Sequence, residues 1–433
     1  MTVLQDTLDL AALPAGNIPA SARSMARFSL FDWLVCGRAG VAEPLAVILR
    51  AYIGAEGGHP VASVFGGLRA PARAAALVNG ATSHALDYDD THFAHVGHPS
   101  VGIYPAALAA GEEVGATAAE VADAFLIGAE VSVRVGIVLG TGHYNRGFHQ
   151  TATAGAFGAT IAAGRLYGLT QDQMRVAIGL CATRASGLKS QFGTMGKPYN
   201  AGIAASNGVE CAGLARAGFT SADDGLMGQQ GFVPTHADAP QMPADTPPGT
   251  FLFEDTKYKL HACCHGTHAM IEALAALKLV HNLTPERVAN VHLRTSPRWL
   301  SVCDIKVPRT GLEVKFSYNW LAGMVLEGIP TASDRAYTDA VAQDATLAGF
   351  AGKITVAGDA AVTDMQAMGE VRLTDGSALP FAHDLAARLS GDVLERSLRA
   401  KATGLIGAEG ERIWSMIAGL DGLNARDLGR ALA

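Results

Sequence analysis

The chain has 433 residues, a formal net charge of −7, 49% hydrophobic residues and only 17% charged residues. A chain of this length and composition folds around a large core, most often in two domains, and is not disordered. The mild acidity and the absence of any run of basic residues argue against nucleic acid as a partner.

The ends of the chain and its cysteines indicate a cellular compartment. The N-terminus has no basic segment followed by an apolar core, so we expect no signal peptide. We also predict no membrane span, because no apolar stretch reaches the roughly 18 residues that a span requires. Six cysteines are scattered without a disulfide framework, which fits a reducing environment. We therefore expect a cytoplasmic protein.

Helical spacing of apolar residues begins near the N-terminus. It predicts helices over residues 19–53 and 113–139, with a glycine-rich loop at 54–67 between them. Residues 151–166 and 200–217 are crowded with Ala and Gly, and side chains this small let packed helices approach closely. We therefore predict an all-helical array over the first half of the chain, with these two segments at its centre.

The second half of the chain has a different pattern. Residues 233–249 are rich in proline and predict an internal boundary or excursion. Alternating residues at 288–295 predict a strand, and 368–381 predict a hairpin that turns at Thr374-Asp375-Gly376. Helices are expected at 267–281 and 312–328, and again from Leu389 to the C-terminus, where the chain returns to the first domain. We place a large helical domain at 1–265 with 395–433 and a smaller α+β domain at 266–394.

The stretch from His84 to Ser100 is the most polar part of the chain. It contains three aspartates and four histidines between two apolar segments. If residues 80–91 are helical, Asp87 and Thr91 lie one turn apart on the same face. Pro99 disfavours helical geometry at the preceding residue, so we expect His98 on a loop. A capping and ion-pair cluster at a helix end is one reading, but these residue types also orient one another for proton transfer, and we favour an active-site wall.

Two further polar segments each precede a helix rich in small residues. Tyr144, Arg146 and His149 offer a phenol, a guanidinium and an imidazole where we expect a helix N-terminus, a place that favours anions. His149 is also a candidate for a simple helix cap. Lys197 stands in a small, apolar stretch, where it can clamp a substrate carboxylate or act as a base. A surface lysine in a turn is the alternative, which the scarcity of other charges nearby disfavours.

The segment from Lys257 to His268 suggests metal binding at first sight. Cys263-Cys264-His265 followed by His268 lacks the usual C-x-x-C spacing, and no second ligand pair is evident. His92, His95 and His98 are spaced like a metal triplet, but Pro99 interferes with their display on a helix. We therefore predict no metal and no cofactor, and we take His268 as a functional imidazole.

With these stretches in order, the chain resembles the MmgE/PrpD family, which includes 2-methylcitrate dehydratase, cis-aconitate decarboxylase and iminodisuccinate epimerase. The resemblance rests on His84-Ala-Leu-Asp-Tyr-Asp-Asp-Thr, His98-Pro-Ser, Gly147-Phe-His-Gln-Thr, the segment 197–208, Gly218-Phe-Thr and the segment 257–268. It implies a homodimer whose subunits each have a large helical domain and a smaller α+β domain. It also implies a cofactor-free site in the cleft between those domains.

The resemblance implies that the family's site falls on six residues of this chain, namely Asp87, Thr91, His98, His149, Lys197 and His268. One position departs from the family pattern. Where cis-aconitate decarboxylase has a tyrosine, this chain has Trp320, with Tyr318 two residues earlier. The resemblance therefore favours decarboxylation less than the other family reactions.

The leading functional hypothesis is a lyase that removes a proton next to a carboxylate of a small di- or tricarboxylate and eliminates water. In it Lys197 and one of His98, His149 or Arg146 hold carboxylates, and Asp87 with Thr91 orients an imidazole. The alternative is an epimerase of an imino- or amino-dicarboxylate, with Lys197 and Tyr144 as opposed bases. A non-catalytic carboxylate-binding protein is the third hypothesis.

Overall fold

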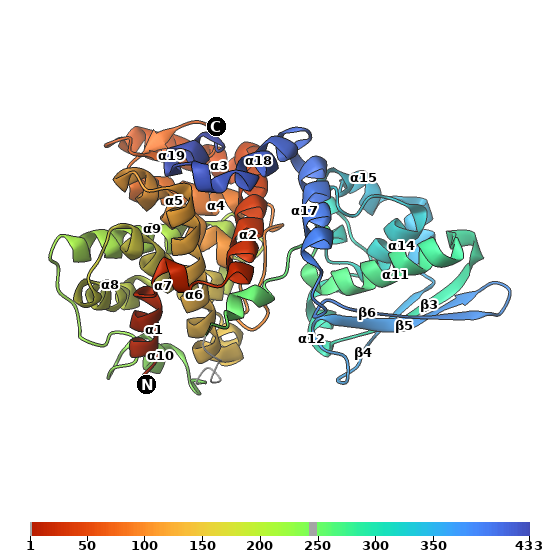
Figure 1. The fold of residues 1–433 in the computed structure, drawn as a ribbon. Coiled ribbons are helices and arrows are strands. Elements are labelled where there is room, and N and C mark those ends of the chain that lie inside the picture. Colours follow the sequence, from red (N-terminus) through yellow and green to blue (C-terminus); the bar gives the residue numbers. More distant parts are fainter. Residues whose placement is uncertain (1, 242–248) are drawn as a thin grey trace. The chain divides into compact units, whose positions relative to one another are not determined.

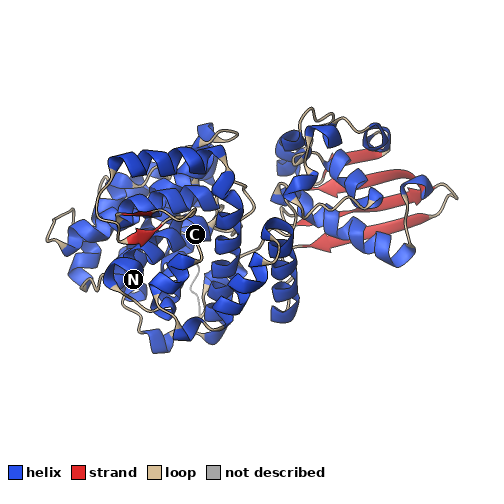
Figure 2. Ribbon diagram, turned by 90° about the horizontal axis from the view of Figure 1, so that it is seen from above, coloured by secondary structure: helices blue, strands red, loops and turns tan. Residues whose placement is uncertain are grey.

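The computed structural model describes residues 2–241 and 249–433. The chain divides into two compact units (Figure 1). Unit 1 comprises residues 1–258 and 406–433, and unit 2 comprises residues 259–405. Figure 2 shows unit 1 as almost entirely helical and unit 2 as helices around one sheet, which confirms the predicted fold class. The observed divisions fall at 258/259 and 405/406, whereas the sequence placed them at 265/266 and 394/395.

Helices make up nearly all of unit 1. They are α1 (Val3–Ala11), α2 (Ala20–Ala39), α3 (Pro44–Glu56), α4 (Ala72–Ser83), α5 (Pro99–Val114), α6 (Ala118–Arg146), α7 (Gln150–Leu166), α8 (Gln171–Arg184), α9 (Gly196–Arg216), α10 (Phe232–His236), α18 (Glu409–Ala418) and α19 (Ala425–Arg430). Two short strands, β1 (Ala62–Ser63) and β2 (Arg69–Ala70), form a small antiparallel hairpin.

The predicted small-residue helices lie at the centre of unit 1. α7 packs against α5, α6, α8 and α9, and α4 packs against α5 and α9. The contacts are close enough that side chains are excluded from them. A Cβ on Gly128 of α6 would lie 2.4 Å from the carbonyl oxygen of Gly158 in α7, and one on Gly158 would lie 2.5 Å from that of Gly128. Glycine is therefore required on both sides of this crossing.

Some predicted elements of unit 1 need correction. The single helix expected over 19–53 is two helices, because the chain turns between α2 and α3 and Pro44 opens the second. The hairpin of β1 and β2 begins within the segment expected to be a loop. Part of the predicted proline-rich boundary at 233–249 lies outside the described residues.

The helix α6 tests the prediction that no apolar stretch reaches the length of a membrane span. Among the described residues it is the one helix long and apolar enough to cross a membrane by length and composition, so that prediction was wrong. However, 78% of its most apolar 18-residue stretch is buried inside the protein. The core helix of a globular unit satisfies the same criteria, so the length of α6 carries no membrane argument.

Unit 2 is built on a four-stranded sheet with the order β4-β3-β5-β6. Its strands are β3 (Val288–Thr295), β4 (Ile354–Gly358), β5 (Gln366–Leu373) and β6 (Ala378–Asp384). β3 pairs in parallel with β4, and the other pairs are antiparallel. The unit's helices are α11 (His268–His281), α12 (Pro297–Cys303), α13 (Gly311–Val314), α14 (Tyr318–Glu327), α15 (Asp339–Ala342), α16 (Ala345–Ala351) and α17 (Gly391–Ile406).

The sequence located the main elements of unit 2. The strand predicted at 288–295 has the observed bounds of β3, and the predicted hairpin is that of β5 and β6. α11 packs on β5 and β6 and also on α14. The helix predicted at 312–328 is broken into α13 and α14, because Ser317 starts a new helix by accepting a hydrogen bond from the Trp320 amide.

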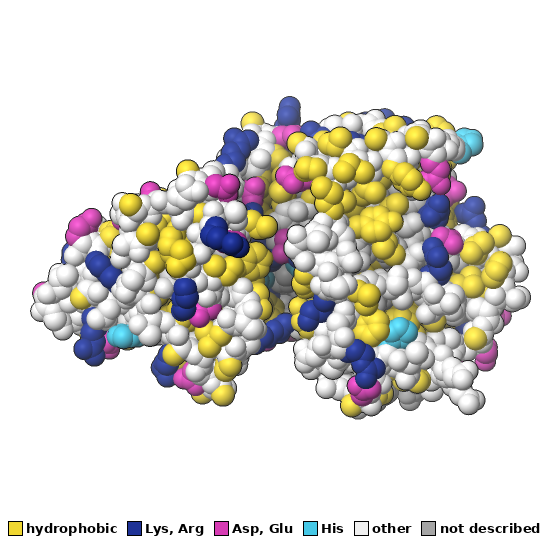
Figure 3. All heavy atoms as spheres, turned by 180° about the vertical axis from the view of Figure 1, so that it is seen from behind, with side chains coloured by type: hydrophobic (Ala, Val, Ile, Leu, Met, Phe, Trp, Pro, Cys, Tyr) yellow, Lys and Arg dark blue, Asp and Glu magenta, His cyan; other side chains and the backbone are white. Residues whose placement is uncertain are grey.

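Charged groups are dispersed over the face drawn in Figure 3. There, Lys and Arg side chains stand singly or in twos among acidic and uncharged groups, and hydrophobic side chains also reach the surface in several places. This face therefore carries no extended area of positive charge among the described residues.

Candidate active site

The polar stretch that begins at His84 is a loop and not a helix. α4 ends at Ser83, so the helical placement of Asp87 and Thr91 on one face is wrong. Asp87 has φ +52° and Val96 has φ +54°, a backbone region that residues other than glycine rarely occupy. Aspartate tolerates this conformation better than most residues, whereas a β-branched valine does so only under constraint. Two strained residues in one loop indicate that its shape serves a purpose other than stability.

Hydrogen bonds connect the loop to neighbouring segments at several points. The backbone of Thr91 exchanges two hydrogen bonds of 2.7 Å with that of Lys257, and His92 Nε2 lies 2.8 Å from the Leu252 carbonyl oxygen. The buried Asp90 accepts hydrogen bonds from the Ser29 hydroxyl and from the hydroxyl and amide of Ser100. These contacts hold the side chains between Asp87 and His98 in fixed positions.

Asp87 lies between two predicted site residues. Its Oδ2 is 2.7 Å from Lys197 Nζ, and its Oδ1 is 3.5 Å from His98 Nε2. Asp87 has 37% of its side chain exposed, whereas Lys197 has 16% and His98 has 12%. Tertiary folding thus brings together three residues that are up to 110 positions apart in the sequence, with the carboxylate of Asp87 nearest the solvent.

Asp89 joins this group although the sequence analysis did not select it. Its two oxygens lie 2.8 Å from His84 Nδ1 and 2.8 Å from His98 Nδ1, and its side chain is fully buried. Burial by itself raises the pKa of Asp89, but the imidazoles of His84 and His98 hold that pKa well below its usual value. The sequence shows three aspartates in this stretch, but it does not show which of them faces the imidazoles, because that depends on the irregular backbone of the loop.

His149 lies behind the same cluster. It is the residue before α7 but makes no side-chain cap, so the capping interpretation is wrong for its imidazole. Instead, Asn200 Nδ2 lies 3.2 Å from its Nδ1, and the ring lies 6.1 Å from that of His84. Burial lowers the pKa of His149 well below its usual value, and the neighbouring His84 and Lys197 lower it further. His149 is therefore neutral at pH 7.

The tautomer of His149 follows from its partner. The Asn200 amide nitrogen lies 3.2 Å from the Leu188 carbonyl oxygen as well as 3.2 Å from His149 Nδ1, so the nitrogen is the amide atom that faces the ring. An amide nitrogen only donates, which makes Nδ1 the acceptor and leaves the proton on Nε2. His149 thus offers a neutral N–H donor. Asn200 was not singled out from the sequence, because an asparagine within a predicted helix carries no distinctive signal.

Three helix N-termini meet at this point of unit 1. His98 directly precedes α5, His149 directly precedes α7, and Lys197 lies in the first turn of α9. These three helices pack against one another, and the His98 amide donates a hydrogen bond to Thr151 Oγ1 across the α5–α7 contact. None of the three helices has a side-chain cap. Their partial positive charges and the Lys197 ammonium together favour an anion.

We call His84, Asp87, Asp89, His98, His149 and Lys197 the acid–base cluster. Aromatic contacts complete it. The His84 and His98 rings meet edge to face at 4.6 Å, and Phe192 meets His149 in the same way at 5.0 Å. Lys197 Nζ lies 5.4 Å from the centre of the Phe192 ring, which has 37% of its surface exposed. The cluster contains a cation, a neutral donor and an imidazole between two carboxylates, which are the groups that proton abstraction beside a carboxylate requires.

Two predicted site residues have other surroundings. Tyr144 and Arg146 lie in the last turn of α6, at a helix C-terminus and not at the expected N-terminus. The Arg146 guanidinium pairs with the exposed Asp238, and Lys189 Nζ lies 3.6 Å above the centre of the Tyr144 ring. The error arose because the chain turns at Gly147, with φ +118°, between α6 and α7.

Thr91 and His268 complete the predicted set. Thr91 lies in the loop, and its hydroxyl is 3.4 Å from the Lys257 carbonyl oxygen. His268 belongs to unit 2, where it begins α11. Its ring lies 4.5 Å from that of His265 and 5.0 Å from that of His261, and burial lowers its pKa well below the usual value. Its buried Nε2 makes no hydrogen bond among the described residues.

Part of the cluster has ligand types that suit a metal ion. One ligand atom from each of His84, Asp87, Asp89 and His98 falls within 4.8 Å of the others. However, the Lys197 ammonium already lies against Asp87 and supplies the positive charge there. Asp89 is also already engaged, because its Oδ1 is hydrogen-bonded to His84 and its Oδ2 makes an ion-pair contact of 2.8 Å with Nδ1 of His98.

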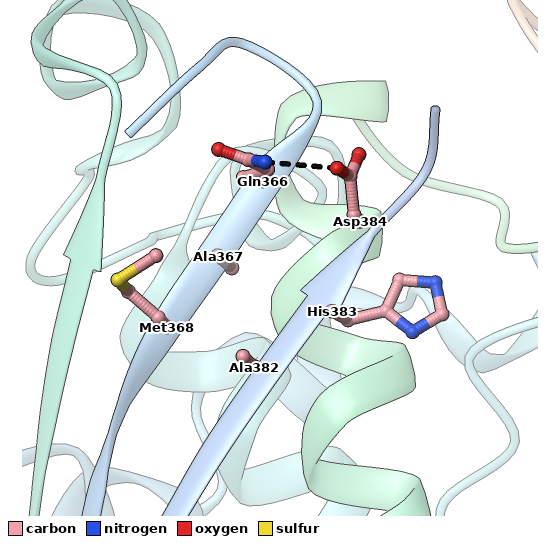
Figure 4. A pocket seen from close by; sticks show the side chains of 6 residues that line it. All are labelled: Gln366, Ala367, Met368, Ala382, His383 and Asp384. Atoms are coloured by element: carbon pink, nitrogen blue, oxygen red, sulfur yellow. Dashed lines mark hydrogen bonds between the residues drawn. The ribbon is translucent and has the colours of Figure 1, made fainter. Parts of the chain in front are cut away.

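A surface hollow in unit 2 is a weaker candidate for an active site than the acid–base cluster. It lies along β5 and β6 and is lined by Gln366, Ala367, Met368, Ala382, His383 and Asp384 (Figure 4). Gln366 donates a hydrogen bond of 2.8 Å to Asp384, which is the interaction drawn there. Its carboxylate is thus already paired, and the six lining residues include no Lys or Arg to hold a substrate carboxylate.

Known protein families match both parts of the chain. The MmgE/PrpD N-terminal domain matches residues 10–244, and the MmgE/PrpD C-terminal domain matches residues 261–417. The chain belongs to the MmgE/PrpD family. The family resemblance expected from the sequence is thereby confirmed.

Three relatives of this MmgE/PrpD protein are named as cis-aconitate decarboxylases or as similar to them. A cis-aconitate decarboxylase of Aspergillus terreus is 29% identical over 314 residues, which cover 67% of this chain and 64% of the relative. The cis-aconitate decarboxylase-like protein oryM of Aspergillus oryzae is 30% identical over 61% of this chain and 59% of its own length. Human cis-aconitate decarboxylase is 25% identical over 61% and 57%, respectively. The match thus spans less than two thirds of each relative.

Proposed function

We propose that this protein is a lyase that removes a proton next to a carboxylate of a small di- or tricarboxylate and eliminates water. The observation that carries the proposal is the convergence of His98, His149 and Lys197 at the N-termini of three packed helices. The helix termini and the Lys197 ammonium attract a carboxylate, while the imidazole of His98 lies beside them to take up a proton.

The assignment of the base follows from the carboxylates around His98. Asp89 lies against Nδ1 of this ring and Asp87 lies near Nε2. Nearby negative charge favours a protonated imidazole, so His98 is the imidazole of the cluster best suited to accept a proton from carbon. His149 is a neutral donor in this scheme and stabilises the enediolate that forms. Lys197 holds the carboxylate whose neighbouring carbon reacts.

The proposed elimination balances without a cofactor. His98 takes the proton from the carbon next to the carboxylate, and the electron pair of that C–H bond is delocalised onto the carboxylate as an enediolate. The electrons return to form a carbon–carbon double bond as the hydroxyl on the next carbon departs. The imidazolium of His98 supplies the proton that releases this hydroxyl as water, which restores the starting protonation state.

Decarboxylation is a second candidate, because the relatives named above are cis-aconitate decarboxylases. Trp320 and Tyr318, where this chain differs from the decarboxylase pattern, are both engaged in hydrogen bonds within the protein. Trp320 donates a hydrogen bond to the Val341 carbonyl oxygen, and the Tyr318 hydroxyl lies 2.9 Å from the Gly266 carbonyl oxygen and 3.0 Å from Thr295 Oγ1. For the epimerase alternative, Tyr144 lies in the last turn of α6 with the Lys189 ammonium 3.6 Å above its ring, so a cation other than Lys197 is its neighbour.

Proton NMR in deuterium oxide with a panel of di- and tricarboxylates separates these reactions. We expect loss of the hydrogen next to the carboxylate together with new alkene signals and no release of carbon dioxide. Release of carbon dioxide would establish the decarboxylase instead. Deuterium incorporation with a change in optical rotation and no alkene would establish an epimerase, and tight binding of a panel member without exchange would indicate a carboxylate-binding protein.

A further inference from the structure

Asp89 occupies a position in the acid–base cluster that no proposed chemical step uses. It is completely buried, and each of its oxygens lies 2.8 Å from Nδ1 of a different imidazole, that of His84 and that of His98. The two rings meet edge to face at 4.6 Å. A single carboxylate thus holds two histidines at once through the same ring atom.

The chemistry of the three groups fixes where the protons lie. An ionised carboxylate only accepts hydrogen bonds, so an imidazole nitrogen 2.8 Å away must carry a hydrogen. Both Nδ1 atoms therefore carry a hydrogen: that of His84 is hydrogen-bonded to Asp89 Oδ1, and that of His98 lies in a close electrostatic contact with Oδ2. For a neutral His98, this leaves the lone pair on Nε2, on the side of the ring that faces Asp87 and Lys197.

We propose that Asp89 is a positioning residue that locks His98 in the tautomer with hydrogen on Nδ1, so that Nε2 is the atom that exchanges protons with the substrate. The proposal rests on the function proposed above and names the ring atom through which His98 acts. Asp89 itself does not touch the substrate, because its side chain is buried beneath the two imidazoles.

Other charged groups around His98 do not provide the same control. Asp87 lies 3.5 Å from Nε2, pairs closely with Lys197 and is exposed enough to be displaced by a substrate carboxylate. His149 and His95 are the other titratable groups that act on this region, and burial lowers the pKa of both, to about 3 for His95. Asp89, by contrast, combines full burial with contact to Nδ1 of His98.

Replacing the carboxylate by its amide tests the lock with almost no change of shape. An asparagine has one acceptor oxygen and one donor nitrogen, so in Asp89→Asn only one of the two Nδ1–H groups keeps an acceptor. The other imidazole must present a lone pair to the amide and move its hydrogen to Nε2. When that ring is His98, its reactive nitrogen is blocked.

The measurement is ¹⁵N NMR of the full chain labelled at histidine, without substrate. The signals of His84 and His98 are assigned by their loss in His84→Gln and His98→Gln. At a pH at which the two rings are neutral, we expect both in the wild type to carry hydrogen on Nδ1, and in Asp89→Asn we expect one of them to change tautomer. The matched control is Asp90→Asn, a buried neighbour bound to Ser29 and Ser100, which should leave both tautomers unchanged.

Kinetics supply the second readout. In Asp89→Asn with a switched His98 we expect kcat to fall by about 10- to 100-fold, with KM changed by less than about twofold because Lys197 remains in place. A neutral wild-type His98 with hydrogen on Nε2 and none on Nδ1 would overturn the proposal even if the variant did not fold. So would a switched tautomer with unchanged kcat. If the wild type turns over no panel member, the proposed function fails, while the spectra still decide the tautomer.

Discussion

The Lys197 ammonium lies 2.7 Å from the carboxylate of Asp87, a residue whose backbone has φ +52°. The ion pair is partly exposed, so an arriving substrate carboxylate can replace Asp87 as the partner of Lys197. The strained backbone directs Asp87 toward both Lys197 and His98, so the three groups are held together before substrate arrives.

Removal of Lys197 should abolish turnover without unfolding the protein. Lys197→Ala removes the cation that holds the substrate carboxylate, and we expect kcat/KM to fall on the order of 100- to 1,000-fold. Lys197→Arg keeps the charge and should retain part of the activity. The matched control is Lys306→Ala, which removes an exposed lysine paired with Asp304. Full activity in Lys197→Ala, measured by the NMR assay, would eliminate Lys197 from the mechanism.

Arg146 should be dispensable, contrary to the expectation from sequence. Its guanidinium pairs with the exposed Asp238, and an exposed pair contributes little to stability. We expect Arg146→Ala to keep kcat/KM within about threefold of the wild type, with a similarly small effect of Asp238→Ala. A large rise in KM in Arg146→Ala alone would restore Arg146 as a substrate-binding residue.

Asp90 should make the protein less stable as pH rises from 4 to 7. Burial raises the pKa of Asp90 to about 7, and the negative charge of Asp32 adds to that effect. The unfolded chain releases this proton near pH 4 while the folded protein keeps it, so the stabilisation is complete below pH 4 and is lost as pH rises through 7. By linkage the change amounts to at most about 4 kcal/mol.

The difference between Asp90→Asn and the wild type isolates this effect. The amide keeps hydrogen-bonding partners for Ser29 and Ser100 but does not ionise. Urea unfolding should therefore show the variant gaining stability relative to the wild type between pH 4 and pH 7. Asp89 acts in another window, because its lowered pKa stabilises the fold above pH 4 and is lost below it. A stability difference that is flat with pH would mean that Asp90 is ionised in the folded protein.

Chelation should leave turnover unchanged. Asp87 already pairs with Lys197 and Asp89 already lies against the imidazoles of His84 and His98, so a metal ion must displace an existing ion pair to bind. We expect dialysis against EDTA to change kcat by less than about twofold. Loss of activity that one divalent ion restores would show that the cluster is a metal centre.

Local sequence patterns predicted most of the elements and much of the chemistry. Helical spacing and the high Ala and Gly content of 151–166 and 200–217 predicted the core helices. Side chains this small are visible in the sequence, and they allow two packed helices to approach closely. The strand at 288–295 and the hairpin with its Asp-Gly turn were equally local. Residue types alone pointed to the His84–Ser100 loop and to Lys197.

The tertiary structure alone decided which of these groups act together. Asp87, Asp89 and Asp90 are neighbours in sequence, yet one pairs with Lys197, one binds two imidazoles and one is turned toward Ser29 and Ser100. A regular helix or strand would have assigned their directions from spacing. This loop is irregular, with positive φ at Asp87, so spacing does not predict the direction of each side chain. That direction depends on tertiary contacts, including those with Lys197 and Ser29 from distant segments.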